Sequence, residues 1–405
     1  RLLNVKGMVV EDVSIDDSPL RPAPAPVVRV RRRKGALRCP RCGRKCPKHD
    51  DGGGERRWRH QDFGCYGVEL MGLAPRVACA EHGVVAAQVP WAEPGSRFTG
   101  DFEMECAWPA AVANQKTVDG FPRIAWRTAG HIARRVAARL EESAMPCMFD
   151  GPTAIGVDET GAEGGHTHIT VAVDHKRRRV AWAHDGYGKE VLDLFFRQPT
   201  DEQRTSIKAV TGDGAKWIDA SVKERLPNAE RVLDSFHIVS RMSDAPDQVG
   251  KRLRNQARRG NDKTATEAMR GVRYAVPKNP EDLTERQDTD PRGQPYRSWQ
   301  LKKLPGTLPH QPLGQAGAEL KRWIFRASHS RIPEIVELCR KIRRRKDDIP
   351  KTIRPGHSNA RLEAFNNKIK ATIRMAYGFR HVDDLIAMIK LRCSGPPIHL
   401  PTPIL

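Results

Sequence analysis

The pattern of apolar and polar positions along the chain predicts both strands and helices. From residue 154 onwards, short apolar runs are separated by turn residues, which is the pattern of buried strands. Between the later runs, two stretches carry their apolar residues at helical spacing. The expected strands lie at 155–158, 167–173, 179–183, 207–210 and 228–233, and the expected helices at 189–197 and 216–225. The pattern therefore predicts a mixed α/β core in this region.

The order of these elements is three strands, helix, strand, helix, strand, which is that of a ribonuclease-H-like core. In that topology the first and fourth strands lie side by side. Three of the strands are followed by an acid, namely Asp158, Asp213 and Asp234. Because open α/β sheets place their chemistry at the carboxyl ends of the strands, we expect Asp158 and Asp213 to meet there. The topology favours Asp213 over Asp234 as the neighbour of Asp158.

A fourth acid, Glu363, lies in a helical stretch that follows the Pro355-Gly356 break. Apolar residues form one stripe of this helix, so Glu363 falls on the other face, among amides and a lysine. These polar neighbours are Asn359, Asn366, Asn367 and Lys370. Three carboxylates from distant segments suit a pair of Mg²⁺ ions, which prefer oxygen ligands. A single acid after a strand is equally typical of a turn or a cap, so the prediction depends on the whole set.

Two ligand pairs near the N-terminus predict a metal site. One is spaced as C-x-x-C and the other as C-x-x-H, so that each tight turn can direct two side chains to one ion. The four residues are Cys39, Cys42, Cys79 and His82. Four protein ligands complete a closed tetrahedral site, which is typical of structural rather than catalytic zinc. Cys46 and Cys65 are alternative ligands.

Residues 98–143 have helical patterns. The last of them, 126–142, has an apolar stripe on one side and basic residues on the other. The basic residues are Arg127, His131, Arg134, Arg135 and Arg139. This arrangement is compatible with a helix-turn-helix, and equally with a linker helix that has a solvated basic face.

The charge of the chain favours a polyanionic partner. Lys and Arg number 70 against 49 Asp and Glu, which gives a net charge of +21, and nucleic acid is the commonest partner of such proteins. The basic clusters of residues 241–355, among them Arg340–Lys346, predict contacts to the DNA backbone from an all-helical insertion. The chain shows neither an apolar run of membrane-spanning length nor a signal peptide, so we expect a cytosolic protein.

Taken together, these segments resemble a bacterial insertion-sequence transposase of the acidic-triad (DDE) type. The similarity is greatest to the IS-L-three family, which has an N-terminal zinc-binding domain and a Mutator-like catalytic core. The matching segments are 156–159 (Gly-Val-Asp-Glu), 212–214 (Gly-Asp-Gly), 227–229 (Pro-Asn-Ala), 234–237 (Asp-Ser-Phe-His), 358–359 (Ser-Asn) and 363–370 (Glu-Ala-Phe-Asn-Asn-Lys-Ile-Lys). One departure is His82, where modules of this family more often have a cysteine.

The resemblance implies an enzyme that cuts element ends and joins them to target DNA by two-metal phosphoryl transfer. It assigns the triad to Asp158, Asp213 and Glu363 as Mg²⁺ ligands, and it makes Asp234 and His237 an Asp-x-x-His signature beside them. Whether Asp234 rather than Asp213 is the second metal ligand stays open. The implied partner is double-stranded DNA, bound by a homo-oligomer in the bacterial cytoplasm at the nucleoid. No nucleotide cofactor is expected, because no P-loop is present.

The expected domains are a zinc-binding domain (1–97), a helix-turn-helix region (98–150), the first part of the core (151–240), a helical basic insertion (241–355) and the core helix with the last carboxylate (356–395). Two other functions fit the same features. One is a DNA-binding protein with zinc and helix-turn-helix modules whose catalytic core has decayed. The other is a structure-specific nuclease, although a nuclease would not need two additional N-terminal modules.

Overall fold

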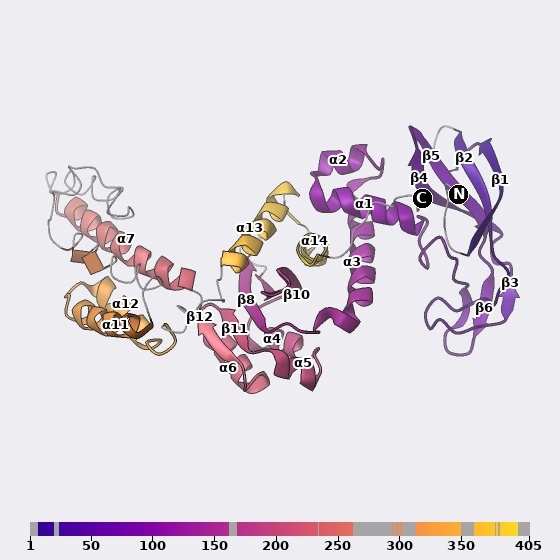
Figure 1. Cartoon of the computed structure of the whole chain (residues 1–405). Coiled ribbons are helices and arrows are strands. Elements are labelled where there is room, and N and C mark those ends of the chain that lie inside the picture. Colours follow the sequence, from indigo (N-terminus) through magenta and orange to yellow (C-terminus); the bar gives the residue numbers. More distant parts are fainter. Residues whose placement is uncertain are drawn as a thin grey trace. The chain divides into compact units, whose positions relative to one another are not determined.

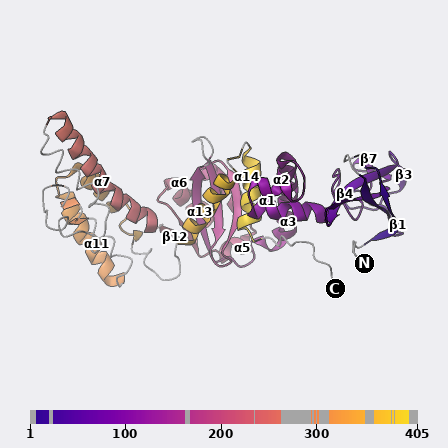
Figure 2. The ribbon, with the colours of Figure 1, turned by 90° about the horizontal axis from the view of Figure 1, so that it is seen from above.

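The computed structural model describes most of the chain. The described residues are 7–19, 24–161, 168–233, 235–261, 294, 297–298, 300–301, 313–349, 360–376, 378–379 and 381–395. They form two compact units, of which the first is discontinuous in sequence (Figures 1 and 2). Unit 1 comprises Arg1–Cys147 and Ile369–Leu405, and unit 2 comprises Met148–Lys368. The finer division into five domains that the sequence suggests stays a prediction.

The N-terminal part of unit 1 is a four-stranded sheet with the order β1-β2-β5-β4. Its strands are β1 (Met8–Asp16), β2 (Ala25–Arg32), β4 (Glu55–Phe63) and β5 (Tyr66–Leu73). Trp58 of β4 packs edge-on against Trp91, with ring centroids 5.4 Å apart, and both side chains are buried. A smaller sheet, β3-β6-β7, joins Lys48–Asp50, Arg76–Cys79 and Gly83–Ala86.

The helical part of unit 1 combines helices from both ends of the chain. It contains α1 (Gly100–Val112), α2 (Gln115–Gly120), α3 (Trp126–Met148) and α14 (Val382–Cys393). Side chains of α14, including Met388 and Leu391, share one core with Phe102 of α1 and Ile132 of α3. Two ion pairs join α14 to α3, Arg134–Asp384 at 3.0 Å and Lys390–Glu141 at 2.7 Å. The C-terminal helix therefore completes the core of an N-terminal bundle.

Unit 2 is built on a five-stranded sheet with the order β10-β9-β8-β11-β12. The strands are β8 (Ala154–Gly161), β9 (His168–Asp174), β10 (Arg179–Asp185), β11 (Ala209–Gly212) and β12 (Glu230–Leu233). The pairs β8–β9 and β9–β10 are antiparallel, whereas β8–β11 and β11–β12 are parallel. The expected adjacency of the first and fourth strands is confirmed. All four residues of β11 are buried, and its one polar side chain, Thr211, has a hydrogen bond with the buried His175 at 2.8 Å.

Three helices follow the strands of this sheet, namely α4 (Lys189–Phe196), α5 (Asp201–Ser206) and α6 (Lys216–Arg225). Leu192 and Phe195 of α4 and Ile218 of α6 enter the same core as Val157 and Val210. The short helix α5 was not expected from the sequence. It begins with a capping box, in which the Thr200 hydroxyl accepts from the backbone of Gln203 and the Gln203 side chain accepts from the backbone of Thr200.

The basic region of unit 2 is helical in its described residues. It comprises α7 (Ser235–Arg259), α11 (Leu313–Ser328) and α12 (Pro333–Arg343), which enclose a core of their own around Trp323 (Figure 1). The last helix to begin in unit 2 is α13 (Ala360–Met375). In the described part of the chain, every helix is too short or too polar to cross a membrane.

We predict that Leu391→Ala, in α14, weakens α1 and α3 as well as its own helix. Leu391 is 4% exposed within the shared core, and removing such a side chain costs about 2–5 kcal/mol of unfolding free energy. Urea denaturation combined with hydrogen exchange on the full chain would report the loss in α1. Asp383→Ala is the control, because Asp383 is exposed on the same helix. Faster exchange confined to α14 would contradict the shared core.

Candidate functional site

Asp158 and Asp213 occupy neighbouring positions of the parallel pair β8–β11. Asp213 directly follows the last residue of β11, as expected, whereas Asp158 lies within β8, which continues to Gly161. The register pairs Val157 of β8 with Gly212 of β11, so the following residue on each strand is one of these acids. Both side chains are half-buried. The next strand, β12, pairs its Leu233 with Gly212. Asp234 and the side chain of His237 lie outside the described residues, so the preference for Asp213 over Asp234 stays a prediction.

The turn after β11 is shaped by a close backbone approach. A Cβ atom added to Gly212 would lie 2.8 Å from the carbonyl oxygen of Val157, which is closer than side chains tolerate. Just beyond it, the Ala215 backbone N–H donates to Asp213 Oδ1 at 2.9 Å. This Asx-type contact fixes one carboxylate oxygen of Asp213 against its own backbone. The glycine thus lets the two strand ends approach, and the turn orients the acid.

Asn366 connects α13 to the end of β8. Its Nδ2 donates to Asp158 Oδ2, and its Oδ1 accepts from the Thr160 hydroxyl at 3.1 Å. The second oxygen of Asp158, Oδ1, accepts from the Glu159 backbone at 2.8 Å. The Thr160 contact fixes the amide orientation, because only the NH₂ group then faces the carboxylate. Glu363 precedes Asn366 by three residues and therefore lies on the same face of α13, where it is exposed.

Glu159 follows Asp158 on β8 and is not one of the predicted metal ligands. Burial and the negative charges of Asp213 and Asp158 raise its pKa above the usual range for a glutamate. Its Oε1 is buried and lacks a hydrogen-bond partner among the described residues. Because successive side chains of a strand point to opposite faces, Glu159 lies on the other face of β8 from Asp158.

The four predicted zinc ligands converge on one point. All their ligand atoms lie within 4.8 Å of one another. The Cys42 and Cys79 sulfurs are 3.7 Å apart, and His82 Nδ1 lies 3.6 Å from Cys79 and 3.8 Å from Cys39. A tetrahedral zinc ion with Zn–S bonds of about 2.3 Å requires sulfurs about 3.8 Å apart, so the group fits zinc. The hydrogen bond with His82 lowers the pKa of Cys79 to about 6, which favours the thiolate that binds metal.

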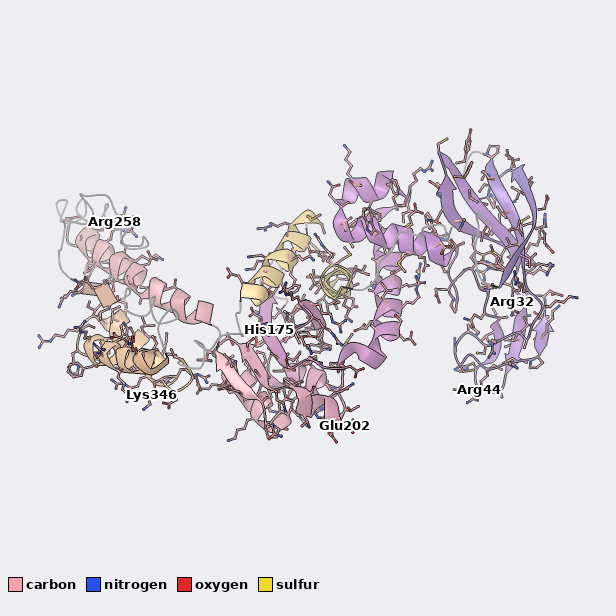
Figure 3. The ribbon with its side chains drawn as sticks, in the orientation of Figure 1. Arg32, Arg44, His175, Glu202, Arg258 and Lys346 are labelled. Carbon is pink, nitrogen blue, oxygen red and sulfur yellow. The ribbon has the colours of Figure 1, made fainter. Side chains whose placement is uncertain are left out.

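The alternative zinc ligands named from the sequence are not part of this group. Cys46 is half-buried and Cys65 is exposed, and the cluster found among the described residues contains neither. On the zinc module, Arg44 is exposed and pairs with Glu81 at 3.3 Å (Figure 3).

The basic side of α3 differs from the expected DNA-facing surface. Arg135 and Arg139 pair with the buried Glu103, at 2.6 Å and 3.7 Å, and Arg134 pairs with Asp384. These three arginines are therefore neutralised within unit 1. Arg127 and His131, at the beginning of the helix, are exposed.

Comparison with known proteins shows the family of the chain. The family model for transposases of the DDE, ISL3 type matches residues 155–389. The chain belongs to the ISL3 family of DDE transposases. A second model, described as the zinc finger of transposases IS204, IS1001, IS1096 and IS1165, matches residues 36–82 and so ends on His82.

Two sets of relatives support this membership. The transposase for insertion sequence element IS1557 of Mycobacterium tuberculosis, in two strains, is 37% identical over 98% of this chain and 94% of its own length. The transposase for insertion sequence element IS1001 of Bordetella parapertussis is 25% identical over 88% of each chain. The resemblance inferred from the sequence is thus confirmed, including the enzyme class.

For the zinc module of this ISL3 transposase we predict about one zinc per chain, as a closed four-ligand site requires. Elemental analysis of the purified full chain measures it. Cys79→Ser should lose the metal, because the hydroxyl does not supply a thiolate. Cys46→Ser is the matched control and should keep it. Loss of zinc from the Cys46 variant would mean that the ligand set is different.

For the acidic site we predict that Asn366→Ala lowers Mg²⁺-dependent DNA cleavage by about 10- to 100-fold. The estimate corresponds to ~1.5–3 kcal/mol for a hydrogen bond to a charged group. Asn366→Asp should be worse, because it places a second carboxylate against Asp158. Asn367→Ala, at the neighbouring exposed position, should cleave like the unchanged protein. Equal cleavage rates for the Asn366 and Asn367 alanine variants would mean that the Asn366 side chain has no role in cleavage.

Proposed function

We propose that Asp158, Asp213 and Glu363 hold two Mg²⁺ ions and that the enzyme cuts and joins DNA at the end of this sheet. The observation that carries the proposal is the β8–β11 register, which places Asp158 beside Asp213, together with the Asn366 contact that brings the Glu363-bearing helix to β8. Carboxylate oxygens from three segments are the donor set that Mg²⁺ prefers.

The residues of the site would act by holding and orienting rather than by attacking. When bound, the ions would supply a nucleophilic water of lowered pKa and would stabilise the leaving oxygen of the phosphodiester. The contacts of Ala215 with Asp213, and of Asn366 and the Glu159 backbone with Asp158, would orient the two carboxylates. Cleavage would free a 3′ hydroxyl, which would then attack target DNA. The strand order supports a ribonuclease-H-like core for this chemistry.

We also propose how the chain binds DNA. Helices α1, α2 and α3 would form a helix-turn-helix whose recognition helix presents Arg127 and His131, because the first residues of such a helix contact base edges. The zinc held by Cys39, Cys42, Cys79 and His82 would be structural. The basic helices of unit 2, where Arg258 and Lys346 are exposed, would contact phosphates along the duplex (Figure 3). Two element ends would be brought together by a homo-oligomer.

Mutation of the acids tests the catalytic proposal. Asp158→Ala, Asp213→Ala and Glu363→Ala should each lower cleavage and strand transfer by several orders of magnitude, because each removes a metal ligand. The substrate is a plasmid that carries the native DNA flanking the gene on both sides. Binding to those ends, measured by gel shift, should stay nearly intact because unit 1 is unchanged.

Asp234→Ala distinguishes the two possible triads. If Asp213 is the ligand, Asp234→Ala keeps some Mg²⁺-dependent cleavage while Asp213→Ala keeps none. The opposite ranking would move the triad to Asp158, Asp234 and Glu363. If the unchanged protein binds the ends but never nicks them with Mg²⁺ or Mn²⁺, the alternative of a DNA-binding protein with a decayed catalytic core is correct. Nicking without strand transfer, on any branched DNA, would favour the nuclease.

A further inference from the structure

A chain of ion pairs links the segment after α12 to the turn that carries Asp213. Arg345 is half-buried and reaches the start of α6, where its Nη2 donates to the Gly214 carbonyl at 2.9 Å. The same nitrogen pairs with Asp219 Oδ2. Arg345 Nη1 lies 3.4 Å from Asp348 Oδ2. A residue of the helical region thus contacts the turn at the proposed metal site.

Arg231 of the neighbouring strand β12 contacts the same turn. Its Nε lies 3.1 Å from Asp219 Oδ1, so Arg231 contacts one oxygen of Asp219 and Arg345 contacts the other. Its Nη1 donates to the Gly212 carbonyl at 3.4 Å, and its Nη2 donates to the Asp213 carbonyl. The side chain is only 13% exposed, and burial lowers the pKa of its guanidinium below the usual value for arginine.

Together the two arginines hold three consecutive carbonyls, those of residues 212, 213 and 214. Their described contacts go to backbone oxygens and to Asp219 and Asp348, so the Asp213 carboxylate keeps its place on the Ala215 amide. Two guanidinium groups and two carboxylates cancel in charge. The arrangement therefore fixes the turn without adding net positive charge that would repel a cation.

We propose that Arg345 and Asp219 are positioning residues that hold Asp213 in place for metal binding and so couple the helical region to the catalytic site. The inference rests on the proposed role of Asp213 as a metal ligand. It also changes the expectation for the basic cluster Arg340–Lys346, because Arg345 contacts the core and is not available to a phosphate. Its neighbour Arg344 is exposed.

Arg345→Met and Arg344→Met form a matched pair, because each removes one positive charge from the same turn. Mn²⁺ binding to the full chain without DNA is measured by calorimetry, and cleavage is measured over a range of Mg²⁺ concentrations. We expect Arg345→Met to raise the Mn²⁺ dissociation constant about tenfold, which equals ~1.4 kcal/mol of binding free energy. The Mg²⁺ concentration that gives half-maximal cleavage should rise by the same factor. The rate at saturating Mg²⁺ should stay within about threefold. Arg344→Met should leave both metal constants unchanged.

Two further variants separate positioning from general damage. Arg345→Lys keeps the positive charge but lacks the planar guanidinium group, so it should bind metal more tightly than Arg345→Met but less tightly than the unchanged protein. Asp219→Asn should weaken metal binding as Arg345→Met does, and the double variant should be no worse than either single one, because both act through one network.

Three outcomes would overturn the inference. A lower rate at every Mg²⁺ concentration, with an unchanged half-saturation point, would mean that Arg345 only stabilises the fold. Normal metal binding, with a loss of DNA affinity in gel shift equal to that measured for Arg344→Met, would make Arg345 a phosphate contact. If the unchanged protein neither binds Mn²⁺ nor cleaves with Mg²⁺, the proposed function itself fails, and this inference fails with it.

Discussion

The parallel pairing of β8 with β11 is the constraint on which the acidic site depends. It places the ends of two strands that are far apart in sequence at one edge, and Gly212 permits the approach because any side chain there would meet the Val157 carbonyl. A parallel pair cannot be joined by a tight hairpin, so the chain must pass through β9, β10 and two helices between them. The described elements between β8 and β11 return the chain so that Asp213 ends beside Asp158.

Asp158 and Asp213 are each oriented by a neutral or charge-balanced neighbour. Asp158 is contacted by an amide, Asp213 by a backbone N–H, and the turn beneath Asp213 by arginines that are themselves paired. Such contacts fix geometry without neutralising the carboxylates, which is what preorganisation of a cation site requires. The raised pKa of Glu159 comes first from its burial, and the negative charges of Asp213 and Asp158 add to it.

Local patterns were sufficient to predict much of this molecule. The C-x-x-C and C-x-x-H pairs specified the metal cluster because both ligands of a pair come from one turn, and the acids after apolar runs specified the sheet edge because strand order follows from the element order. Charged helix faces were less informative. The same basic stripe on α3 could face DNA or pair internally, and only the tertiary position of Glu103 and Asp384 determined that three of its arginines are paired. Arg345 illustrates the same limit, because its partner Asp219 is 126 residues away.

The shared core of α1, α3 and α14 has a consequence for biosynthesis. Unit 1 begins and ends the described chain, and residues 148–368 of unit 2 are translated between its two parts. Domains fold as they leave the ribosome, so the sheet of unit 2 can form before α14 is synthesised. Until then the apolar surfaces of α1 and α3 that pack against α14 are exposed. The helical bundle of unit 1 would then close last. A nascent polypeptide would have an ordered acidic site before it had a complete bundle, so premature termination before residue 382 would release a chain whose N-terminal helices expose their core.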